Sequence, residues 1–228
     1  MTDITIAFDL DGTLVDTAPD LIGALNVAIG LEGLDPIEVA DAKSVVGAGA
    51  RAMITRALAM RERDITPERF EELTNAFLDH YAANIAALSQ PFPGIEAALD
   101  RLAADGARLV VCTNKLERFA VSLLDSLGMS HRFAAICGGD TFGAPKPDPR
   151  CLLGTIARGG GDAARAVMIG DSITDLKAAR ASGVPVVLVD FGYTDIPARE
   201  LGADAVIGHF DQLAPALSRL RHQAGAPA

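Results

Sequence analysis

Cysteine and histidine are scarce in this chain, which has 228 residues but only three cysteines and four histidines. The cysteines, at positions 112, 137 and 151, form no CxxC pair, and the histidines are scattered without metal-ligand spacing. A disulfide framework and a histidine-based metal site are therefore not expected. The first residues, MTDITIAF, lack the basic region and the long apolar segment of a secretory signal. Together with reduced cysteines, this predicts a cytoplasmic protein.

Basic residues and long apolar runs are also few. The chain has 20 basic and 30 acidic residues and a formal net charge of −10 at pH 7. We therefore expect neither a nucleic acid nor a membrane surface as partner, because both bind basic surfaces. No apolar run approaches the ~20 residues of a membrane-spanning helix. Hydrophobic residues still make up 50% of the sequence, enough for a large buried core. The sequence leaves open whether the protein is a monomer or a homodimer.

Six short apolar runs, rich in β-branched residues and bounded by turn residues, are typical of buried strands. They lie at residues 4–8, 108–113, 133–138, 166–170, 185–189 and 205–208. From the second run onward, helix-like segments separate them, among them LERFAVSLLDSLG, DPRCLLGTIARG, TDLKAARASG and IPARELG. Strands that alternate with helices predict an α/β fold, a doubly wound parallel sheet with helices on both faces.

The gap between the first two strands is too long for a single crossover. It contains several helical patterns, including an aromatic stripe in PERFEELTNAFLDHYAANI whose expected role is packing between helices. Within it, Thr17-Ala-Pro-Asp20 predicts a capping box at the start of a helix. We therefore expect a helical cap domain at residues 17–88, inserted into a core domain made of residues 1–16 and 89–228.

Polar residues follow several of the predicted strands. Asp9 and Asp11 come directly after the first strand. Two like charges at the end of a buried strand are unfavourable, because they repel each other and lose hydration, so we expect that a cation or a reaction requires them. The other polar stretches are Thr113-Asn114-Lys115, Lys146 in GAPKPDP, and Asp171 and Asp175 in GDSITD. The carboxyl ends of parallel strands meet at one edge of a sheet, where ligands bind. We expect these side chains to converge there.

The sequence contains four fragments that resemble the four motifs of the haloacid dehalogenase (HAD) superfamily of phosphohydrolases, and they occur in the same order. These fragments are DLDGT, CTN, PKPDP and GDSITD. The inserted helical segment resembles the cap domain of that superfamily. The resemblance implies a Rossmann-like core and Mg²⁺-dependent hydrolysis of a small phosphate monoester through an aspartyl-phosphate. The chemistry agrees, because carboxylate oxygens suit Mg²⁺ and phosphoryl transfer requires a metal and a lysine to neutralise developing charge.

Matched position by position, the resemblance makes Asp9 the nucleophile and a Mg²⁺ ligand. Asp11 would protonate the leaving group, later deprotonate the attacking water, and offer its backbone carbonyl to the metal. Asp171 would ligate Mg²⁺, and Asp175 would serve the metal site through a water or pair with the motif lysine. Gly12 allows the backbone to turn sharply after the acidic pair.

The remaining motif residues would bind the phosphoryl group. The Thr113 hydroxyl and the Asn114 backbone amide would hold its oxygens, and Lys146 would offset charge on the nucleophile and the phosphate. Lys115 is expected to be a solvated or gating lysine and not a catalytic one. Arg51, in GAGARAM, is a candidate for bidentate binding of a substrate carboxylate, with a solvated surface arginine as the alternative.

Within the superfamily, four stretches most resemble the enzymes that hydrolyse 2-phosphoglycolate: FDLDGTLVDTAPDL, VVGAGARAMITRAL, VVCTNKLERFAVSLLDSLG and ICGGDTFGAPKPDP. The later FGYTD resembles a loop of the same enzymes, and a cap over the cleft favours small substrates. The alternatives are a sugar-phosphate phosphatase or phosphomutase of the superfamily, and a non-catalytic phosphate-binding regulatory protein. A protein that only binds phosphate has no need of Asp11, which disfavours the last alternative. Mn²⁺ in place of Mg²⁺ stays open.

Overall fold

The computed structural model describes residues 4–224. Its centre is a six-stranded parallel sheet in the order β5-β4-β1-β6-β7-β8. The strands are β1 Thr5–Phe8, β4 Arg108–Cys112, β5 Ala135–Cys137, β6 Ala166–Gly170, β7 Val186–Val189 and β8 Ala205–Ile207. The predicted parallel sheet is confirmed, and the strand ends differ from the predicted ones by one or two residues. The central strand β1 pairs Phe8 with Val111 on one side and with Ile169 on the other.

Alternate residues of the strands face two layers of helices, as the period of two along a strand requires. Ile6 and Phe8 pack against the first layer, whereas Ala7 and Met168 face the second. The first layer contains α5 Ile95–Ala104, α6 Glu117–Ser126 and α9 Leu213–Ala224, and the second contains α7 Pro149–Arg158 and α8 Ile173–Ala181. Both faces of the sheet are therefore covered by helices, as in other open parallel sheets, where ligands bind beyond the carboxyl ends of the strands.

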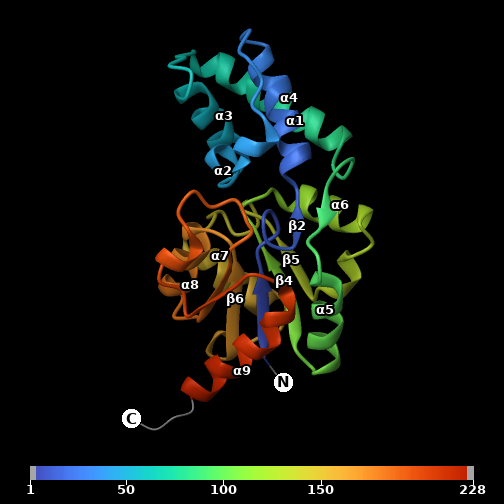
Figure 1. Cartoon of the computed structure of the whole chain (residues 1–228). Coiled ribbons are helices and arrows are strands. Elements are labelled where there is room, and N and C mark those ends of the chain that lie inside the picture. Colours follow the sequence, from blue (N-terminus) through green and yellow to red (C-terminus); the bar gives the residue numbers. More distant parts are fainter. Residues whose placement is uncertain (1–3, 225–228) are drawn as a thin grey trace.

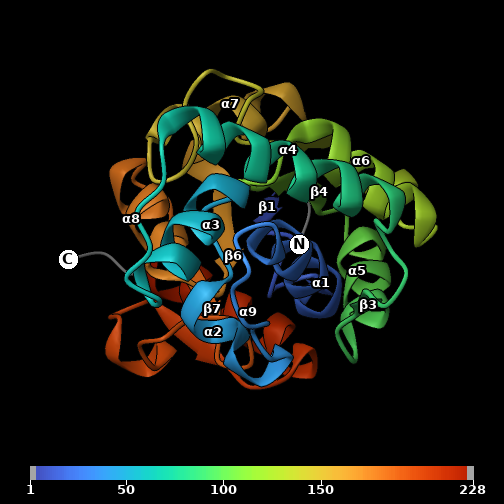
Figure 2. The same ribbon diagram turned by 90° about the horizontal axis from the view of Figure 1, so that it is seen from above.

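Four more helices lie above the carboxyl ends of the strands (Figure 1). The view from above shows these helices lying across that edge of the sheet (Figure 2). They are α1 Ala18–Gly30, α2 Ala42–Val45, α3 Ala50–Ala59 and α4 Pro67–Ala83. They share a hydrophobic cluster, in which Leu25, Ile54 and Phe77 are buried. The aromatic stripe of α4 packs into this cluster, as its spacing predicts. These helices form the segment for which the sequence predicts an inserted domain.

Two short strands connect this helical segment to the sheet (Figure 1). They are β2 Val15–Asp16 and β3 Gln90–Pro91, and they pair in antiparallel orientation. The backbone amide of Phe92 donates to the carbonyl of Leu14 at 3.1 Å, which extends the pairing by one hydrogen bond. The chain thus leaves the sheet and returns to it through adjacent strands.

The predicted capping box at the start of α1 is wrong. Thr17 precedes the helix, but its hydroxyl donates to Asp11 Oδ1 at 2.7 Å instead of capping an amide of the helix. Asp20 accepts hydrogen bonds from the backbone amides of Leu88 and Ser89. Both side chains have partners outside the first turn of α1, and these bonds replace the local ones that a capping box requires.

The helix-like segments after β4, β5 and β6 are confirmed as α6, α7 and α8. The segment IPARELG forms only the 3₁₀ turn Ala198–Glu200, so the prediction of a helix there is wrong. The segment lies between β7 and β8 and is too short for a stable helix, because Gly202, with a φ of +77°, ends it soon after Pro197. Among residues 4–224, every helix is too short or too polar to cross a membrane.

Candidate active site

Asp9 directly follows β1, at the carboxyl edge of the sheet. Its Oδ1 accepts a hydrogen bond from the Leu10 amide at 2.7 Å, which fixes the direction of the carboxylate. The chain then turns at Gly12, whose φ is +78°. A Cβ at this position would lie 2.5 Å from Asp171 Oδ2, so only glycine fits. The sharp turn predicted after the acidic pair is therefore present, and it brings the first motif against the fourth.

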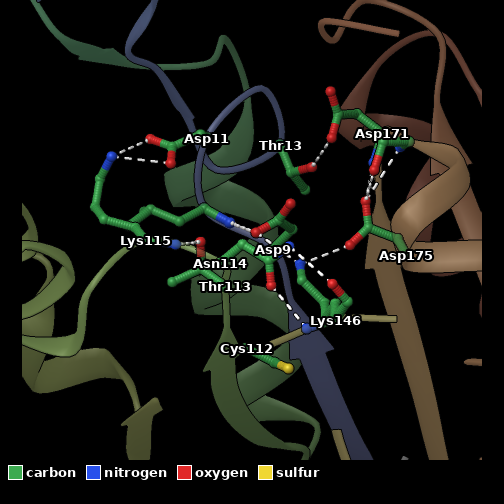
Figure 3. Close-up of polar contacts among 12 residues, drawn as sticks. Asp9, Asp11, Thr13, Cys112, Thr113, Asn114, Lys115, Lys146, Asp171 and Asp175 are labelled. Atoms are coloured by element: carbon green, nitrogen blue, oxygen red, sulfur yellow. Dashed lines mark hydrogen bonds and ion pairs between the residues drawn. The ribbon is translucent and has the colours of Figure 1, made fainter. Parts of the chain in front are cut away.

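Three carboxylates meet at this edge. Oxygen atoms of Asp9, Asp171 and Asp175 all lie within 4.8 Å of one another, and the three residues are buried (Figure 3). Two glycines allow this close approach: a Cβ on Gly192 would lie 2.2 Å from Asp171 Cβ, and one on Gly170 would lie 2.4 Å from Asp175 Cβ. Such crowding of like charges is unfavourable without cations.

Lys146 supplies one positive charge to this cluster. Its Nζ lies 2.9 Å from Asp9 Oδ1 and 2.7 Å from Asp175 Oδ1, and its side chain is 1% exposed. Burial by itself would lower the pKa of Lys146, but Asp175 and Asp9 raise it well above its usual value. The Asn114 side chain holds this residue by accepting from the Lys146 amide at 2.8 Å and donating to its carbonyl at 3.0 Å. The second and third motifs are thereby joined.

The charge balance of the cluster leaves room for a divalent cation. Burial raises the pKa of Asp9 to about 7, with Lys146 acting in the opposite direction and Asp175 adding to the rise. Burial and the charges of Asp175 and Asp9 raise the pKa of Asp171 well above its usual value. When all three carboxylates are ionised, as metal binding requires, their charge exceeds that of Lys146 by two, and every donor atom is a hard oxygen. This donor set fits Mg²⁺.

The two oxygens of Asp175 are already engaged. Its Oδ1 accepts a hydrogen bond from Lys146 Nζ. Its Oδ2 accepts hydrogen bonds from the backbone amides of Asp171 and Ser172 and from the Ser172 hydroxyl. Ser172 and Asp175 together form a capping box at the start of α8. This geometry favours the second of its two predicted roles, that of a partner for the lysine. Asp9 and Asp171 are the better placed pair for holding a metal.

Asp11 lies beside this cluster, and its partner is Lys115. The lysine Nζ lies 2.7 Å from Oδ1 and 2.9 Å from Oδ2 of Asp11. The Lys115 side chain is only 5% exposed, so the interpretation of Lys115 as a solvated residue is wrong. The ion pair with Asp11 compensates the charge of the ammonium group, so Lys115 can be buried.

Thr113, at the end of β4, is 1% exposed, and its hydroxyl accepts from the Lys115 amide at 3.2 Å. Thr113 and Asn114 both line a cavity of about 630 Å³, together with the three carboxylates of Asp9, Asp11 and Asp171. Its lining combines residues at the sheet edge with residues of the helices α1–α4. Its size suits a small molecule.

Arg51 lies at the same cavity, on the first turn of α3. Its guanidinium is 4.7 Å from the Phe70 ring centroid and pairs with Glu71 at 2.7 Å, and the side chain is 58% exposed. Arg51 is therefore near the cavity but engaged with another acid, and its contact with a substrate stays a prediction.

Two residues at the site were not anticipated from the sequence. The Tyr193 amide donates to Asp171 Oδ2 at 2.7 Å, and its hydroxyl donates to Asp16 Oδ1 at 2.5 Å. Thr13 Oγ1 lies 3.5 Å from Asp171 Oδ1 (Figure 3). The position of FGYTD after the carboxyl end of a predicted strand was the signal that could have revealed Tyr193.

Comparisons with known proteins identify the family of the chain. Residues 6–189 match the family model described as haloacid dehalogenase-like hydrolase. The chain is 50% identical over 221 residues to a phosphoglycolate phosphatase of Agrobacterium fabrum, covering 97% of this chain and 95% of the relative. It is 48% identical to one of Mesorhizobium japonicum, covering 96% and 97%. A crystal structure of a predicted phosphoglycolate phosphatase from Haemophilus somnus superposes with a TM-score of 0.87 at 28% identity, covering 95% of this chain and 99% of that one.

Proposed function

The chain belongs to the haloacid dehalogenase-like hydrolase family, and we propose that it hydrolyses 2-phosphoglycolate to glycolate and orthophosphate. One observation carries the choice of substrate: the relatives that share about half of its residues, over nearly the whole length of both chains, are named phosphoglycolate phosphatases. The buried carboxylates beside Lys146 and the cavity above them provide the chemical setting.

In the first half of the reaction, Asp9 attacks phosphorus. A bond forms between its carboxylate oxygen and the phosphoryl group, and the bond to the glycolate oxygen breaks. Asp11 gives a proton to the departing alkoxide, which is a poor leaving group without it. The hydrogen bond from the Leu10 amide to Asp9 Oδ1 directs the carboxylate before substrate binds.

In the second half, water attacks the phosphorus of the aspartyl-phosphate. Asp11, now deprotonated, accepts a proton from this water, and the phosphorus–oxygen bond to Asp9 breaks. Orthophosphate leaves, and both aspartates return to their starting states. The Asp11 carboxyl group thus acts first as an acid and then as a base, because it loses its proton in the first half of the reaction and regains one in the second.

The charge of the phosphoryl group is balanced by donors around Asp9. Lys146 lies 2.9 Å from Asp9 Oδ1, and the Thr113 hydroxyl and the Asn114 backbone amide would donate to the phosphoryl oxygens. Asp9, Asp171 and the carbonyl of Asp11 would hold Mg²⁺, with Asp175 positioning the lysine and the loop. A bound Mg²⁺ would neutralise charge on the phosphoryl oxygens.

The test is a screen of small phosphate monoesters with Mg²⁺ or Mn²⁺, which measures orthophosphate release and uses Asp9→Asn as the blank. We expect 2-phosphoglycolate to have the highest kcat/KM and Asp9→Asn to lose about 10³-fold or more in kcat. A higher kcat/KM for a hexose phosphate would overturn the choice of substrate. Conversion of a hexose phosphate to its isomer without orthophosphate would identify a phosphomutase, and turnover by Asp9→Asn at the wild-type rate would refute the nucleophile.

A further inference from the structure

Among the residues whose burial the structure describes, Lys115 is a buried cation to which the proposed mechanism gives no role. Lys115 follows Thr113 and Asn114 in the loop after β4, and its side chain is 5% exposed. It does not join the ion pairs of Lys146 with Asp9 and Asp175, because its Nζ is directed to Asp11 (Figure 3). A second lysine is therefore held at the site by a different acid.

Asp11 is held by Lys115 from one side and by Thr17 from another. The lysine Nζ contacts both carboxylate oxygens, at 2.7 and 2.9 Å, and the Thr17 hydroxyl donates to Oδ1 at 2.7 Å. These three donor contacts restrict rotation of the carboxylate, and of its roughly four lone-pair positions they leave one at which the group can hold a proton. Figure 3 shows the Asp11 carboxylate turned toward Lys115 and away from Asp171 and Asp175.

Lys115 is in turn covered by a side chain from the helical segment. Its Nζ lies 4.7 Å from the ring centroid of Tyr81, a residue of α4 that is 1% exposed. The Tyr81 ring is itself held by an edge contact with Phe119 of α6, with ring centroids 5.6 Å apart. An ammonium group over an aromatic face is attracted by it, most strongly where water is excluded.

We propose that Lys115 is a positioning residue for Asp11 and that Tyr81 fixes Lys115, so that the helical segment orients the carboxyl group that transfers protons. The inference rests on the proposed function only in giving Asp11 that task. Among the described residues, Asp11 is the one acid with which Lys115 forms an ion pair, and it is the side chain to which the mechanism gives this role. Helix α4 is then part of the catalytic apparatus, although its residues need not touch the reacting atoms.

A double-mutant cycle tests the inference. Lys115→Met keeps an unbranched side chain that is one atom shorter and removes its charge. We expect kcat for 2-phosphoglycolate to fall about 10-fold or more while KM changes less than about threefold. In an Asp11→Asn background the same substitution should change kcat less than about twofold, because its target is already lost. Lys115→Arg should recover part of the activity, and Lys177→Met, at an exposed lysine of α8, is the control. Additive losses in the cycle would overturn the proposal.

The leaving group gives a second readout that a structural role would not move. Dinitrophenolate departs without a proton, so the burst of dinitrophenolate from 2,4-dinitrophenyl phosphate should keep its rate in Lys115→Met, while 2-phosphoglycolate turnover falls. Equal losses for both esters would contradict the proposal. Tyr81→Phe, which keeps the aromatic ring, should retain more activity than Tyr81→Leu. The reverse order would show that the ring of Tyr81 does not fix Lys115.

A crystal structure of Lys115→Met decides the matter independently of the substrate. We expect the Asp11 carboxylate to take a new orientation or several, and an unchanged carboxylate would overturn the proposal even if the fold were weakened. If the wild-type protein hydrolysed no phosphate ester, the proposed function would fail, while this structural result would still decide whether Lys115 positions Asp11. The two failures are therefore distinguishable.

Discussion

Asp20 and Ser89 join the two ends of the helical segment, although they lie 69 positions apart in the chain. Asp20 Oδ2 accepts from the Ser89 amide at 2.8 Å and from its hydroxyl at 2.6 Å, and both residues are buried. The Leu88 amide donates to the same carboxylate. One side chain at the start of α1 thus holds the segment where the chain returns to the sheet.

Replacement of Asp20 by alanine should therefore destabilise the protein. Three donors would lose their acceptor, and we expect the free energy of unfolding to fall by about 2–4 kcal/mol, against about 1 kcal/mol for Ser89→Ala. Urea denaturation measures both values. Asp79→Ala, at an exposed position on α4, is the control and should change stability by less than about 0.5 kcal/mol. A small effect at Asp20 would show that water replaces its bonds.

Mg²⁺ should raise the thermal stability of the wild-type protein, because a ligand that binds only the folded state stabilises it by about 2.7 kcal/mol at 100 times its Kd. Asp171→Asn should abolish this increase. Without Mg²⁺, the same variant should be at least as stable as the wild type, because it removes one of three crowded carboxylates. Thermal denaturation with and without Mg²⁺ checks both points. Asp64→Asn, at an exposed position, should respond to Mg²⁺ like the wild type.

Gly12→Ala should damage the site more than the fold. Its Cβ would lie 2.5 Å from Asp171 Oδ2 and 2.8 Å from Tyr193 Cδ2, so Asp171 must move. Gly33→Ala is the matched control, because its φ of +67° imposes similar strain, about 1 kcal/mol, and nothing lies within 4 Å of the added atom. We expect kcat to fall about 10-fold or more only in Gly12→Ala. Equal activity of the two variants would refute the contact.

Arg51→Ala should raise KM for 2-phosphoglycolate about 10-fold if the guanidinium leaves Glu71 to bind the substrate carboxylate. The kcat for p-nitrophenyl phosphate, which has no such carboxylate, should stay within about twofold of the wild type. Steady-state kinetics on both esters measure the difference. Arg180→Ala, which breaks an exposed pair with Asp204 away from the cavity, controls for loss of a surface ion pair. Parallel losses on both esters would leave Arg51 without a role in specificity.

Much of the fold could be predicted from local pattern. Each strand is a short β-branched run, and burial on both faces of a parallel sheet requires such a run. The predicted helix at IPARELG failed because the segment has only a few residues between Pro197 and the left-handed Gly202, too few to nucleate an α-helix. The capping box at Thr17 failed for another reason: its hydroxyl had a better partner in Asp11, which no neighbouring residue reveals.

The order and spacing of four motifs were enough to place Asp9, Lys146 and Asp171 at one edge of the sheet, because parallel strands deliver their carboxyl ends to a common plane. Only the tertiary structure decided which acid pairs with which lysine, that Lys115 is buried against Asp11, and that Tyr81 of a distant helix covers it. The reason is physical. A strand's direction follows from local backbone sterics and burial, whereas an ion pair depends on where side chains from separate elements meet and on how much water remains between them.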